Sequence, residues 1–402
     1  MQCILPAMYS RKATLPNRSF FLLGPRGTGK TTWLRATLPA KTEPTAVIRW
    51  FDLLDDREVA RLLRSPGSFS AAVRALPPGS WVVVDEVQRL PSLLAEVHGL
   101  LTEHPDAWRF ALTGSSARKL RRAGVDLLPG RAINRRFFPL TIAERGFDVD
   151  IDEVLSFGGL PAVVAEPDRR TKVELLSAYV DNYLTQEVRL DATVKNLGSF
   201  TRFLEVATRC NGQVVNVSGL SRDAAVARTT VQGYFEVLTD TLVGDFLPSW
   251  TPALKVRESG HPKWYFFDSG VVRAATGRHF DPLGPDERGP LFETAIVAEL
   301  RAACDVLGLG GGLHTWSLPS ATEVDVVWRR GNRAVGIEIK ASERWRPEHN
   351  RGLSTLLEAK AIDAAFAVYL GATPQRFGPI EVLPVAEFCR RLWGGEILPF
   401  AA

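Results

Sequence analysis

Short apolar runs that each end in a polar residue recur along the first third of the chain, and amphipathic stretches separate them. Continuous apolar runs are typical of strands buried on both faces of a parallel sheet, and their alternation with helical stretches indicates helices on both faces. The runs are Phe20–Leu23, Val47–Phe51, Trp81–Val84 and Phe110–Leu112. The pattern therefore predicts an α/β domain with a parallel sheet over residues 1–145.

The pattern becomes helical after residue 145. Residues 146–198 predict a helical lid region, with helical stretches at 154–157 and 173–188 and a break at 158–161. Residues 199–280 predict a winged helix-turn-helix. Its expected parts are a helix over 200–209, a cap at Ser218, a helix that opens at Thr229 and reaches Leu242, and a strand at 264–267.

Proline and glycine residues from Asp281 to Pro290 predict a linker to a last domain, residues 281–402. A helix is expected over 291–304. Two strands over 323–328 and 334–340 follow, and the turn residues between them suit a hairpin. The apolar stretch 361–370 predicts a helix, and residues 380–383 predict a final strand.

A glycine-rich loop lies between the first apolar run and a helical stretch. Its sequence is Gly24-Pro25-Arg26-Gly27-Thr28-Gly29-Lys30-Thr31-Thr32, which matches the G-x-x-x-x-G-K-[ST] phosphate-binding pattern in the context that this pattern needs. Backbone N–H groups converge on the phosphates, Lys30 reaches the β- and γ-phosphates, and the Thr31 hydroxyl joins the Mg²⁺ shell. The alternative is a plain glycine-rich turn. The loop predicts binding of ATP or GTP.

The third apolar run ends in two acids, Asp85 and Glu86. Asp85 is expected to hold Mg²⁺ directly or through water, and Glu86 to orient or deprotonate the attacking water. The alternative is that these are two solvated acids at the end of a strand. The P-loop earlier in the chain makes this alternative less favoured. The fourth run ends in Thr113-Gly114-Ser115, whose hydroxyl groups are expected near the γ-phosphate, although such residues are also ordinary in turns. Lys30, Glu86 and Ser115 are therefore predicted catalytic residues.

Length and composition bound the class of protein. The 402 residues suffice for two or three domains, and 45% hydrophobic and 23% charged residues are ordinary for a globular chain. Four separated cysteines, Cys3, Cys210, Cys304 and Cys389, indicate neither a disulfide framework nor zinc and favour a reducing cytoplasm. We expect no signal peptide, no membrane helix and no membrane partner.

The chain is mildly basic overall, and many of its basic residues lie in one segment. The formal net charge is +4, which is compatible with a nucleic-acid partner without demonstrating one. Basic residues gather after the fourth apolar run: Arg118, Lys119, Arg121, Arg122, Arg131, Arg135 and Arg136. Such a run is usually a solvated face. The alternative is an arginine that reaches a γ-phosphate of its own or a neighbouring subunit.

A second set of charged residues lies in the last predicted domain. Side chains alternate along a strand, so Glu338 and Lys340 share one face, and Asp325 lies on the adjoining strand. Glu293 on the preceding helix can join them. Carboxylates that hold a divalent cation and a lysine that orients water are the groups that phosphodiester cleavage uses. The spacing is common, and by itself it favours ordinary surface residues.

Together these motifs resemble the bacterial and archaeal AAA+-type ATPases that carry a C-terminal domain of unknown function, DUF4143. The resemblance covers nearly the whole chain, and the combination of early and late motifs makes it specific. It rests on GPRGTGKTT (24–32), VVVDEVQRLP (82–91), LTGSSARKL (112–120), the stretch 130–144, FGGLP (157–161), YVDNYLTQEV (179–188), YFFDSG (265–270), LFE (291–293), EVD (323–325) and IEIK (337–340).

The resemblance implies an α/β fold with three parts: a P-loop AAA+-like parallel sheet, a helical and winged-helix middle region, and a C-terminal α/β domain like a restriction endonuclease. It favours ATP over GTP and implies a homo-oligomer. Asp325, Glu338 and Lys340 fall on the PD-(D/E)xK nuclease signature, with Glu293 on the leading helix. The segment 316–320 lacks an expected basic residue, which leaves substrate contact there without support.

The resemblance also implies an arginine finger. Arg131 in the Gly130-Arg131 motif is the first candidate, with Arg135 and Arg136 behind it.

Three functions compete on these observations. The first is a cytoplasmic, Mg²⁺-dependent ATPase that acts on DNA. Its C-terminal domain would bind the DNA, and cleavage of the DNA by this domain is left open. The second is an ATP-controlled switch that binds a protein partner through an inactive C-terminal domain. The small net charge and the base-poor helix near 229–242 favour this second function. The third is a metal nuclease with ATP as a structural ligand, and Glu86 argues against it.

Overall fold

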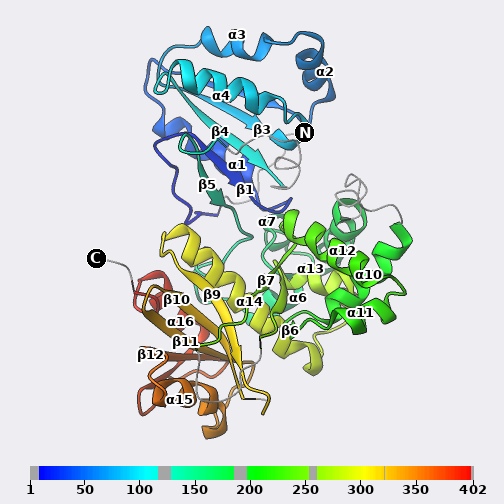
Figure 1. The fold of residues 1–402 in the computed structure, drawn as a ribbon, viewed down its shortest axis with the longest axis vertical. Coiled ribbons are helices and arrows are strands. Elements are labelled where there is room, and N and C mark those ends of the chain that lie inside the picture. Colours follow the sequence, from blue (N-terminus) through cyan, green and yellow to red (C-terminus); the bar gives the residue numbers. More distant parts are fainter. Residues whose placement is uncertain (1–8, 116–127, 185–196, 253–259, 321, 400–402) are drawn as a thin grey trace. The chain divides into compact units, whose positions relative to one another are not determined.

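The chain divides into two compact units. The computed structural model describes residues 9–115, 128–184, 197–252, 260–320 and 322–399 (Figure 1). The P-loop unit contains Ala13–Phe138 and Asp240–Leu242, and the larger unit contains Met1–Lys12, Pro139–Thr239 and Val243–Ala402. Cys3, the basic residues from 118 to 122, and parts of the LTGSSARKL and YVDNYLTQEV motifs lie outside the described residues.

A five-stranded parallel sheet forms the centre of the P-loop unit, and it confirms the predicted sheet. The strand order is β2-β3-β4-β1-β5, and every neighbouring pair is parallel. The strands are β1 Phe20–Leu23, β2 Ile48–Asp52, β3 Ser80–Asp85, β4 Trp108–Gly114 and β5 Ile133–Arg136. Because β4 lies between β1 and β3, the residues that follow these three strands meet at one edge of the sheet.

Helices cover both faces of this sheet. The helices are α1 Lys30–Thr37, η1 Pro39–Lys41, α2 Asp56–Arg64, α3 Ser68–Arg74, η2 Val87–Arg89 and α4 Leu93–Glu103. Helices α2, α3 and α4 contribute to one apolar core, and α1 packs into the other, where Phe20 and Trp81 are fully buried. Burial of each such side chain stabilises the fold by about 2 kcal/mol.

The larger unit begins with helices and continues with a small helical and sheet region. The first helices are α6 Ile151–Phe157, α7 Pro161–Val164, α8 Arg169–Ala178 and η3 Tyr179–Leu184. Next come α10 Leu197–Arg209, β6 Gln213–Val214, α11 Val217–Asp223, α12 Arg228–Asp240, β7 Gly244–Leu247, β8 Lys263–Phe266, α13 Ser269–Ala275 and η4 Arg278–Phe280. The strands form an antiparallel sheet in the order β6-β8-β7.

Two details of this region differ from the sequence predictions. The cap of α11 is Asn216, whose side chain accepts the Gly219 N–H at 3.1 Å, so the predicted cap at Ser218 is wrong. Helix α12 ends at Asp240, short of Leu242. Asparagine is as good an N-cap as serine, and the pattern alone did not distinguish the two positions.

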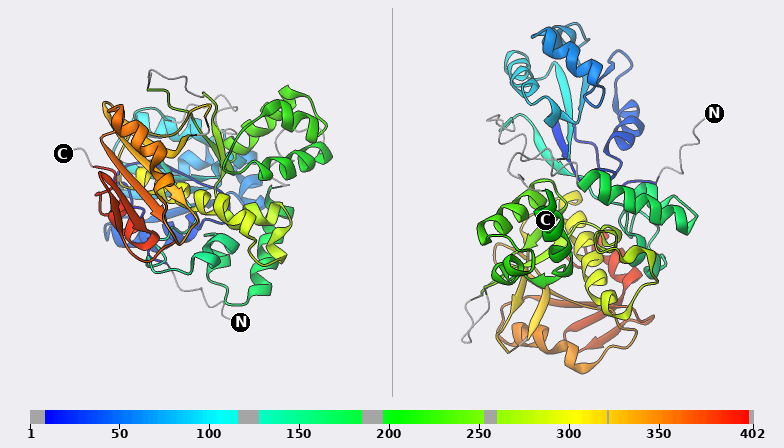
Figure 2. Two further views of the ribbon diagram at one scale, coloured as in Figure 1. Left: turned by 90° about the horizontal axis from the view of Figure 1, so that it is seen from below. Right: turned by 90° about the vertical axis from the view of Figure 1, so that its right-hand side faces the viewer.

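The larger unit ends in a mixed six-stranded sheet with the order β13-β14-β12-β11-β10-β9. Helices α14 and α16 pack together on it, and α15 packs with β10, β11 and β12 through a separate apolar core (Figure 2). The elements are α14 Pro285–Val306, β9 Gly312–Ser317, β10 Glu323–Arg330, β11 Arg333–Lys340, η5 Pro347–Asn350, α15 Arg351–Glu358, β12 Ala364–Tyr369, β13 Gln375–Phe377, β14 Ile380–Pro384 and α16 Val385–Trp393. Strands β10 and β11 form the predicted hairpin.

Two predictions for this part of the chain are wrong. Residues 285–290 are the first turns of α14 and not a linker, because Pro285 suits the first helical position and Glu287 accepts the Gly284 N–H at 2.8 Å. Most of the predicted helix over 361–370 is instead the strand β12, an interior strand that pairs with β11 and β14. A short buried strand has the same apolar character as a buried helix.

The FGGLP and YFFDSG motifs pack against each other. Asp268 is buried, and its carboxylate accepts the Gly159 N–H at 2.7 Å and the Val271 N–H at 3.0 Å. A Cβ on Gly158 would lie 2.0 Å from an Asp268 oxygen, and one on Gly270 would lie 2.3 Å from the Phe157 carbonyl oxygen. These motif residues therefore serve close packing between α6 and α13.

Candidate functional site

The loop after β1 has the backbone that phosphate binding requires. Gly27 and Gly29 have φ angles of 77° and 89°, which glycine adopts without strain. A Cβ on Gly24 would lie 2.1 Å from the Phe137 carbonyl oxygen. Helix α1 begins at Lys30, so the N–H groups of its first turn face the loop. The Lys30 ammonium donates to the carbonyl oxygens of Gly24 at 2.7 Å and Pro25 at 3.1 Å.

The two predicted Mg²⁺ ligands, Thr31 beside the loop and Asp85 at the end of β3, lie side by side. The Thr31 hydroxyl donates to Asp85 Oδ2 at 2.8 Å, and the Thr113 hydroxyl donates to Asp85 Oδ1. Asp85 is buried at the end of β3. Hydroxyl and carboxylate oxygens are the ligands that Mg²⁺ prefers, and the ion usually completes its shell with substrate phosphates and water. Thr31 and Asp85 therefore fit a nucleotide-bound Mg²⁺.

Glu86 is held in an unusual backbone conformation beside this pair. Its φ and ψ are 57° and 49°, in the left-handed region that non-glycine residues rarely adopt. Non-glycine residues with such angles are enriched at functional sites. Its N–H donates to the Thr113 hydroxyl at 3.0 Å. Its carboxylate accepts from the Gln88 amide and from the Ser115 hydroxyl at 3.3 Å, and the Gln88 amide also donates to Ser115 Oγ at 2.9 Å.

Gln88 is a site residue that sequence reasoning did not select. It lies in the VVVDEVQRLP motif, two positions after Glu86. Its side chain is buried and joins the strand end of β3 to Ser115 after β4. Only the spatial adjacency of β3 and β4 reveals this bridge.

Arg131 lies away from its own P-loop. Strand β5 runs parallel to β1, with Ile133 opposite Phe20 and Arg136 opposite Leu23. Arg131 precedes β5 and therefore lies at the opposite end of the sheet from the loop, roughly 10 Å or more along the strand direction. Its guanidinium contacts the His98 ring, 2.6 Å from Nε2. In this structure Arg131 therefore lies away from this chain's own P-loop, and its role as an arginine finger stays a prediction.

Arg136 is another candidate for the arginine finger. It ends β5 beside Leu23, at the ends of the strands where the P-loop begins.

The charged residues predicted in the larger unit do lie together. The Lys340 ammonium is 2.5 Å from Glu338 Oε1 and 3.4 Å from Asp325 Oδ2, and the Ile339 N–H donates to the same Asp325 oxygen at 2.8 Å. Asp325 and Glu338 are buried. Burial raises the pKa of Asp325, but Lys263 and Lys340 outweigh it and hold that pKa below its ordinary value.

A second lysine, which the sequence did not indicate, enters this cluster from β8. The Lys263 ammonium is 3.1 Å from Glu293 Oε1, 3.3 Å from Asp325 Oδ1 and 3.4 Å from Glu323 Oε2. Tyr265 also donates its hydroxyl to Glu293. Burial, together with the charge of Asp325, raises the pKa of Glu293 to about 7. Burial lowers the pKa of Lys263, but the surrounding carboxylates outweigh it and raise that pKa well above its ordinary value.

The structure therefore does not present Glu293, Asp325 and Glu338 as a set of metal ligands. Two ammonium groups lie among these carboxylates. Within the described ranges, no group of three or more His, Cys, Asp and Glu side chains is arranged to hold a metal ion.

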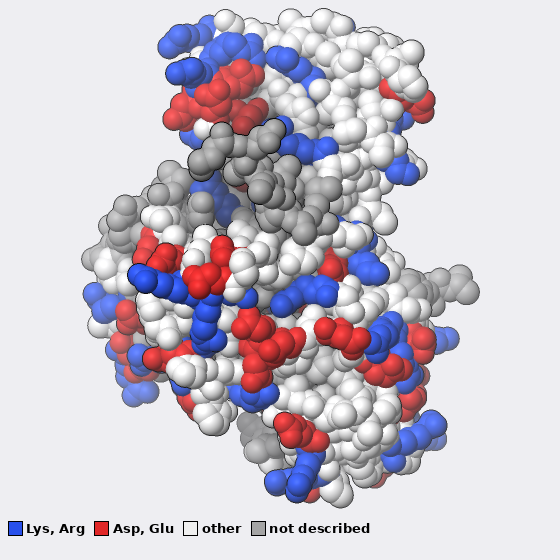
Figure 3. Space-filling model, turned by 180° about the vertical axis from the view of Figure 1, so that it is seen from behind, with Lys and Arg blue, Asp and Glu red and all other residues white. Residues whose placement is uncertain are grey.

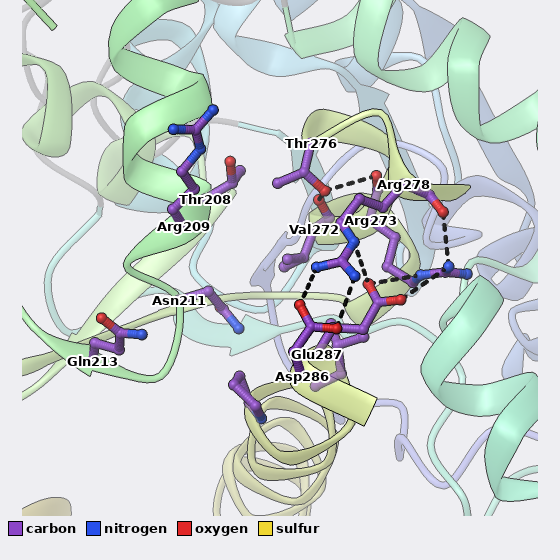
Figure 4. Close-up of a pocket in the computed structure, with 12 residues that line it drawn as sticks. Thr208, Arg209, Asn211, Gln213, Val272, Arg273, Thr276, Arg278, Asp286 and Glu287 are labelled. Atoms are coloured by element: carbon purple, nitrogen blue, oxygen red, sulfur yellow. Dashed lines mark hydrogen bonds and ion pairs between the residues drawn. The ribbon is translucent and has the colours of Figure 1, made fainter. Parts of the chain in front are cut away.

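A polar cavity of about 430 Å³ lies elsewhere in the larger unit, between α10, α13 and the start of α14 (Figure 4). Its acids pair with its arginines: Arg273 is 3.1 Å from Glu287, and Arg278 is 2.6 Å from Asp286. Arg273 also donates to the Arg278 carbonyl at 2.7 Å. These contacts join the loop around η4 to α14, which is a structural role.

Comparisons with known proteins agree with the order of the parts. An AAA domain model matches residues 16–145, and models of two domains of unknown function, DUF8612 and DUF4143, match residues 148–281 and 288–388. The chain is therefore similar to an AAA domain over its first part and to a DUF4143 domain over its last part, which confirms the predicted resemblance. Within the described part of the chain, no helix has the length and apolar character needed to cross a bilayer.

The chain is similar to two curated proteins that carry no assigned activity. The uncharacterized protein Rv2008c of Mycobacterium tuberculosis is 25% identical over 350 residues, which cover 87% of this chain and 76% of the relative. The uncharacterized protein MJ1544 of Methanocaldococcus jannaschii is 19% identical over 310 residues, which cover 71% and 67%.

Solved structures give weaker similarity. AMPPCP-bound DnaA from Aquifex aeolicus has a TM-score of 0.29 at 17% identity, over 55% of this chain and 81% of DnaA. RuvB from Thermotoga maritima has a TM-score of 0.26 at 17% identity, over 57% and 82%. Scores this low carry no conclusion about this chain.

Proposed function

We propose that this protein is a Mg²⁺-dependent ATPase, with the reaction at the P-loop and at the ends of β3 and β4. The contact between Thr31 and Asp85 at 2.8 Å, with Glu86 directly after Asp85, carries this proposal. It places two oxygen ligands for a hard cation beside a carboxylate that can act on water. The AAA domain match supports the same function.

Each residue has a distinct task in this proposal. The P-loop N–H groups and Lys30 bind the β- and γ-phosphates, and Thr31 and Asp85 hold Mg²⁺. When bound, this ion neutralises the charge that develops on the phosphates. Glu86 accepts a proton from the attacking water or orients it. Gln88 and Ser115 hold the Glu86 carboxylate, so Gln88 is a positioning residue.

DNA is the first partner that we propose for this ATPase. The net charge of +4 and the order of elements from α10 to β8, which agrees with a winged helix-turn-helix, support it. A homo-oligomer is proposed with it, because Arg131 lies at the end of the sheet away from its own P-loop, so an arginine finger at this position would act on a neighbour's nucleotide. The cytoplasm is the proposed location of the protein.

A protein partner is the second candidate, and the surface of α12 favours it. Its exposed face carries Arg228, Thr229, Gln232 and Glu236, so one acid offsets one base. On the face shown in Figure 3, Lys and Arg side chains lie among Asp and Glu side chains. DNA binding relies mainly on basic groups against phosphates, and a balanced surface suits protein contact equally well.

Steady-state ATP hydrolysis with no DNA and with single-stranded, duplex or branched DNA tests both proposals. Lys30→Ala gives the background rate. Stimulation by one DNA form, lost in Lys30→Ala, supports the DNA-dependent ATPase and identifies its substrate. Hydrolysis that is indifferent to DNA supports the protein-binding switch, and hydrolysis that does not exceed the Lys30→Ala background contradicts the ATPase itself.

A further inference from the structure

The Lys263 ammonium lies where a divalent cation held by Glu293, Asp325 and Glu323 would lie. Its Nζ is between 3.1 and 3.4 Å from one oxygen each of Glu293, Asp325 and Glu323. A Mg²⁺ ion bound by the same oxygens would sit about 2.1 Å from each. The ammonium and the metal would therefore compete for one place.

The backbone holds Lys263 in this place. It begins β8, the central strand of its sheet, and pairs with Val214 of β6 and Leu247 of β7. The next residue, Trp264, is fully buried, and Lys263 itself is 5% exposed. A metal that displaced this ammonium would leave a buried charge without its carboxylates, which is strongly unfavourable.

Asp325 also has both of its oxygens engaged. Oδ1 faces Lys263, while Oδ2 accepts the Ile339 N–H at 2.8 Å and lies 3.4 Å from Lys340. In a nuclease site of the predicted kind, this aspartate would be the central metal ligand. Here a metal would have to replace contacts to two lysines.

We propose that Lys263 is the permanent cation of this cluster. It takes the place of a divalent metal and ties β8 to α14 and β10, so that the C-terminal domain does not cleave phosphodiester bonds. The chemistry is an ion-pair network in which ammonium and phenol groups hold the carboxylates of Glu293, Glu323 and Asp325. The proposal does not depend on the ATPase activity of the P-loop unit, because none of these residues belongs to that unit.

Mn²⁺ binding to the nucleotide-free full-length protein, measured by electron paramagnetic resonance, tests the proposal. We expect no site in the wild type at millimolar Mn²⁺ that depends on Asp325. Lys263→Met removes the competing ammonium and should create one Mn²⁺ site that the wild type lacks, and Asp325→Asn in the same chain should abolish that site. Lys41→Met, an exposed lysine in the P-loop unit, is the matched control.

Thermal unfolding gives a second readout. Added Mn²⁺ should raise the midpoint of Lys263→Met and leave that of the wild type unchanged, because a ligand stabilises only the state that binds it. A folded Lys263→Met that gains neither Mn²⁺ affinity nor stability contradicts the proposal.

The wild type decides the question if Lys263→Met does not fold. One bound Mn²⁺ that is lost in Asp325→Asn, or Mg²⁺-dependent DNA cleavage that is lost in the same variant, overturns the proposal. ATP hydrolysis measured on the same samples shows separately whether the proposed ATPase stands.

Discussion

The P-loop site and the C-terminal cluster contain the same kinds of residue in different contacts. At the P-loop, Lys30 donates to backbone carbonyl oxygens while Asp85 accepts from hydroxyl groups. In the C-terminal cluster, Lys263 and Lys340 contact Asp325 directly. An acid bonded to neutral donors keeps its charge available for a cation, whereas an acid between ammonium groups is already neutralised. Residue types near one another therefore do not define a metal site until the donors around each acid are known.

The largest expected effect is loss of turnover in Glu86→Gln. The amide keeps the size of the side chain but cannot accept a proton, so ATP hydrolysis should fall by about 10²- to 10⁴-fold while nucleotide binding persists. Steady-state hydrolysis and binding of a fluorescent nucleotide measure the two quantities. Glu103→Gln, on the surface of α4 in the same unit, is the control and should hydrolyse normally. Unchanged turnover in Glu86→Gln shows that another group activates the water.

The next effect concerns stability and compares the two lysines of the C-terminal cluster. The side chain of Lys263 is 6% exposed, whereas that of Lys340 is 30% exposed. Lys263→Met leaves buried carboxylates without their cation and should lower the free energy of unfolding by about 3 to 5 kcal/mol. Lys340→Met should cost less, because water reaches the remaining charge. Urea unfolding without divalent metal measures both variants, and equal losses would remove the distinction between the two lysines.

The same comparison shows what the sequence could establish. The P-loop and the β10–β11 hairpin depend on residues that are close in the chain, and both were predicted. Lys263 was missed because it comes from a strand 62 residues before Asp325. The position of Arg131 was also beyond reach, because the order of strands decides that β5 lies next to β1. Strand β12 was taken for a helix, since burial on both faces removes the alternation that distinguishes the two.

A smaller effect is expected at Gln88, which tests whether the Glu86 carboxylate needs its neighbours. Gln88→Ala removes the amide that bonds both Glu86 and Ser115. Misorientation of the base should lower kcat about tenfold with little change in KM, because Gln88 contacts Glu86 and not the P-loop. Steady-state kinetics at saturating and low ATP separate the two constants. A rise in KM with normal kcat would instead indicate that Gln88 supports nucleotide binding.

The last effect concerns Glu299, a buried acid whose carboxylate accepts hydrogen bonds from N–H groups. Its carboxylate accepts from the Ile142 N–H at 2.8 Å, the Ala143 N–H at 3.2 Å and the Trp393 indole at 2.7 Å. Burial, outweighing these donors, raises its pKa to about 7. The folded state then retains a proton that the unfolded chain releases near its ordinary pKa of 4.5. The free energy of unfolding should therefore fall as pH rises from about 5 to about 7 and level off above it, by at most about 3 kcal/mol.

Glu299→Gln isolates this contribution, because an amide does not titrate. The NH₂ group of the variant faces N–H donors, so the variant should be less stable than the wild type. Its urea midpoint should depend less on pH than that of the wild type, so the loss relative to the wild type should be larger near pH 5 than above pH 7. Glu358→Gln, an exposed residue at the end of α15, should keep the wild-type pH dependence. If Glu299→Gln also keeps the wild-type pH dependence, the three N–H donors hold Glu299 ionised at every pH tested. A buried carboxylate in this unit would then be stabilised without a neighbouring ammonium group.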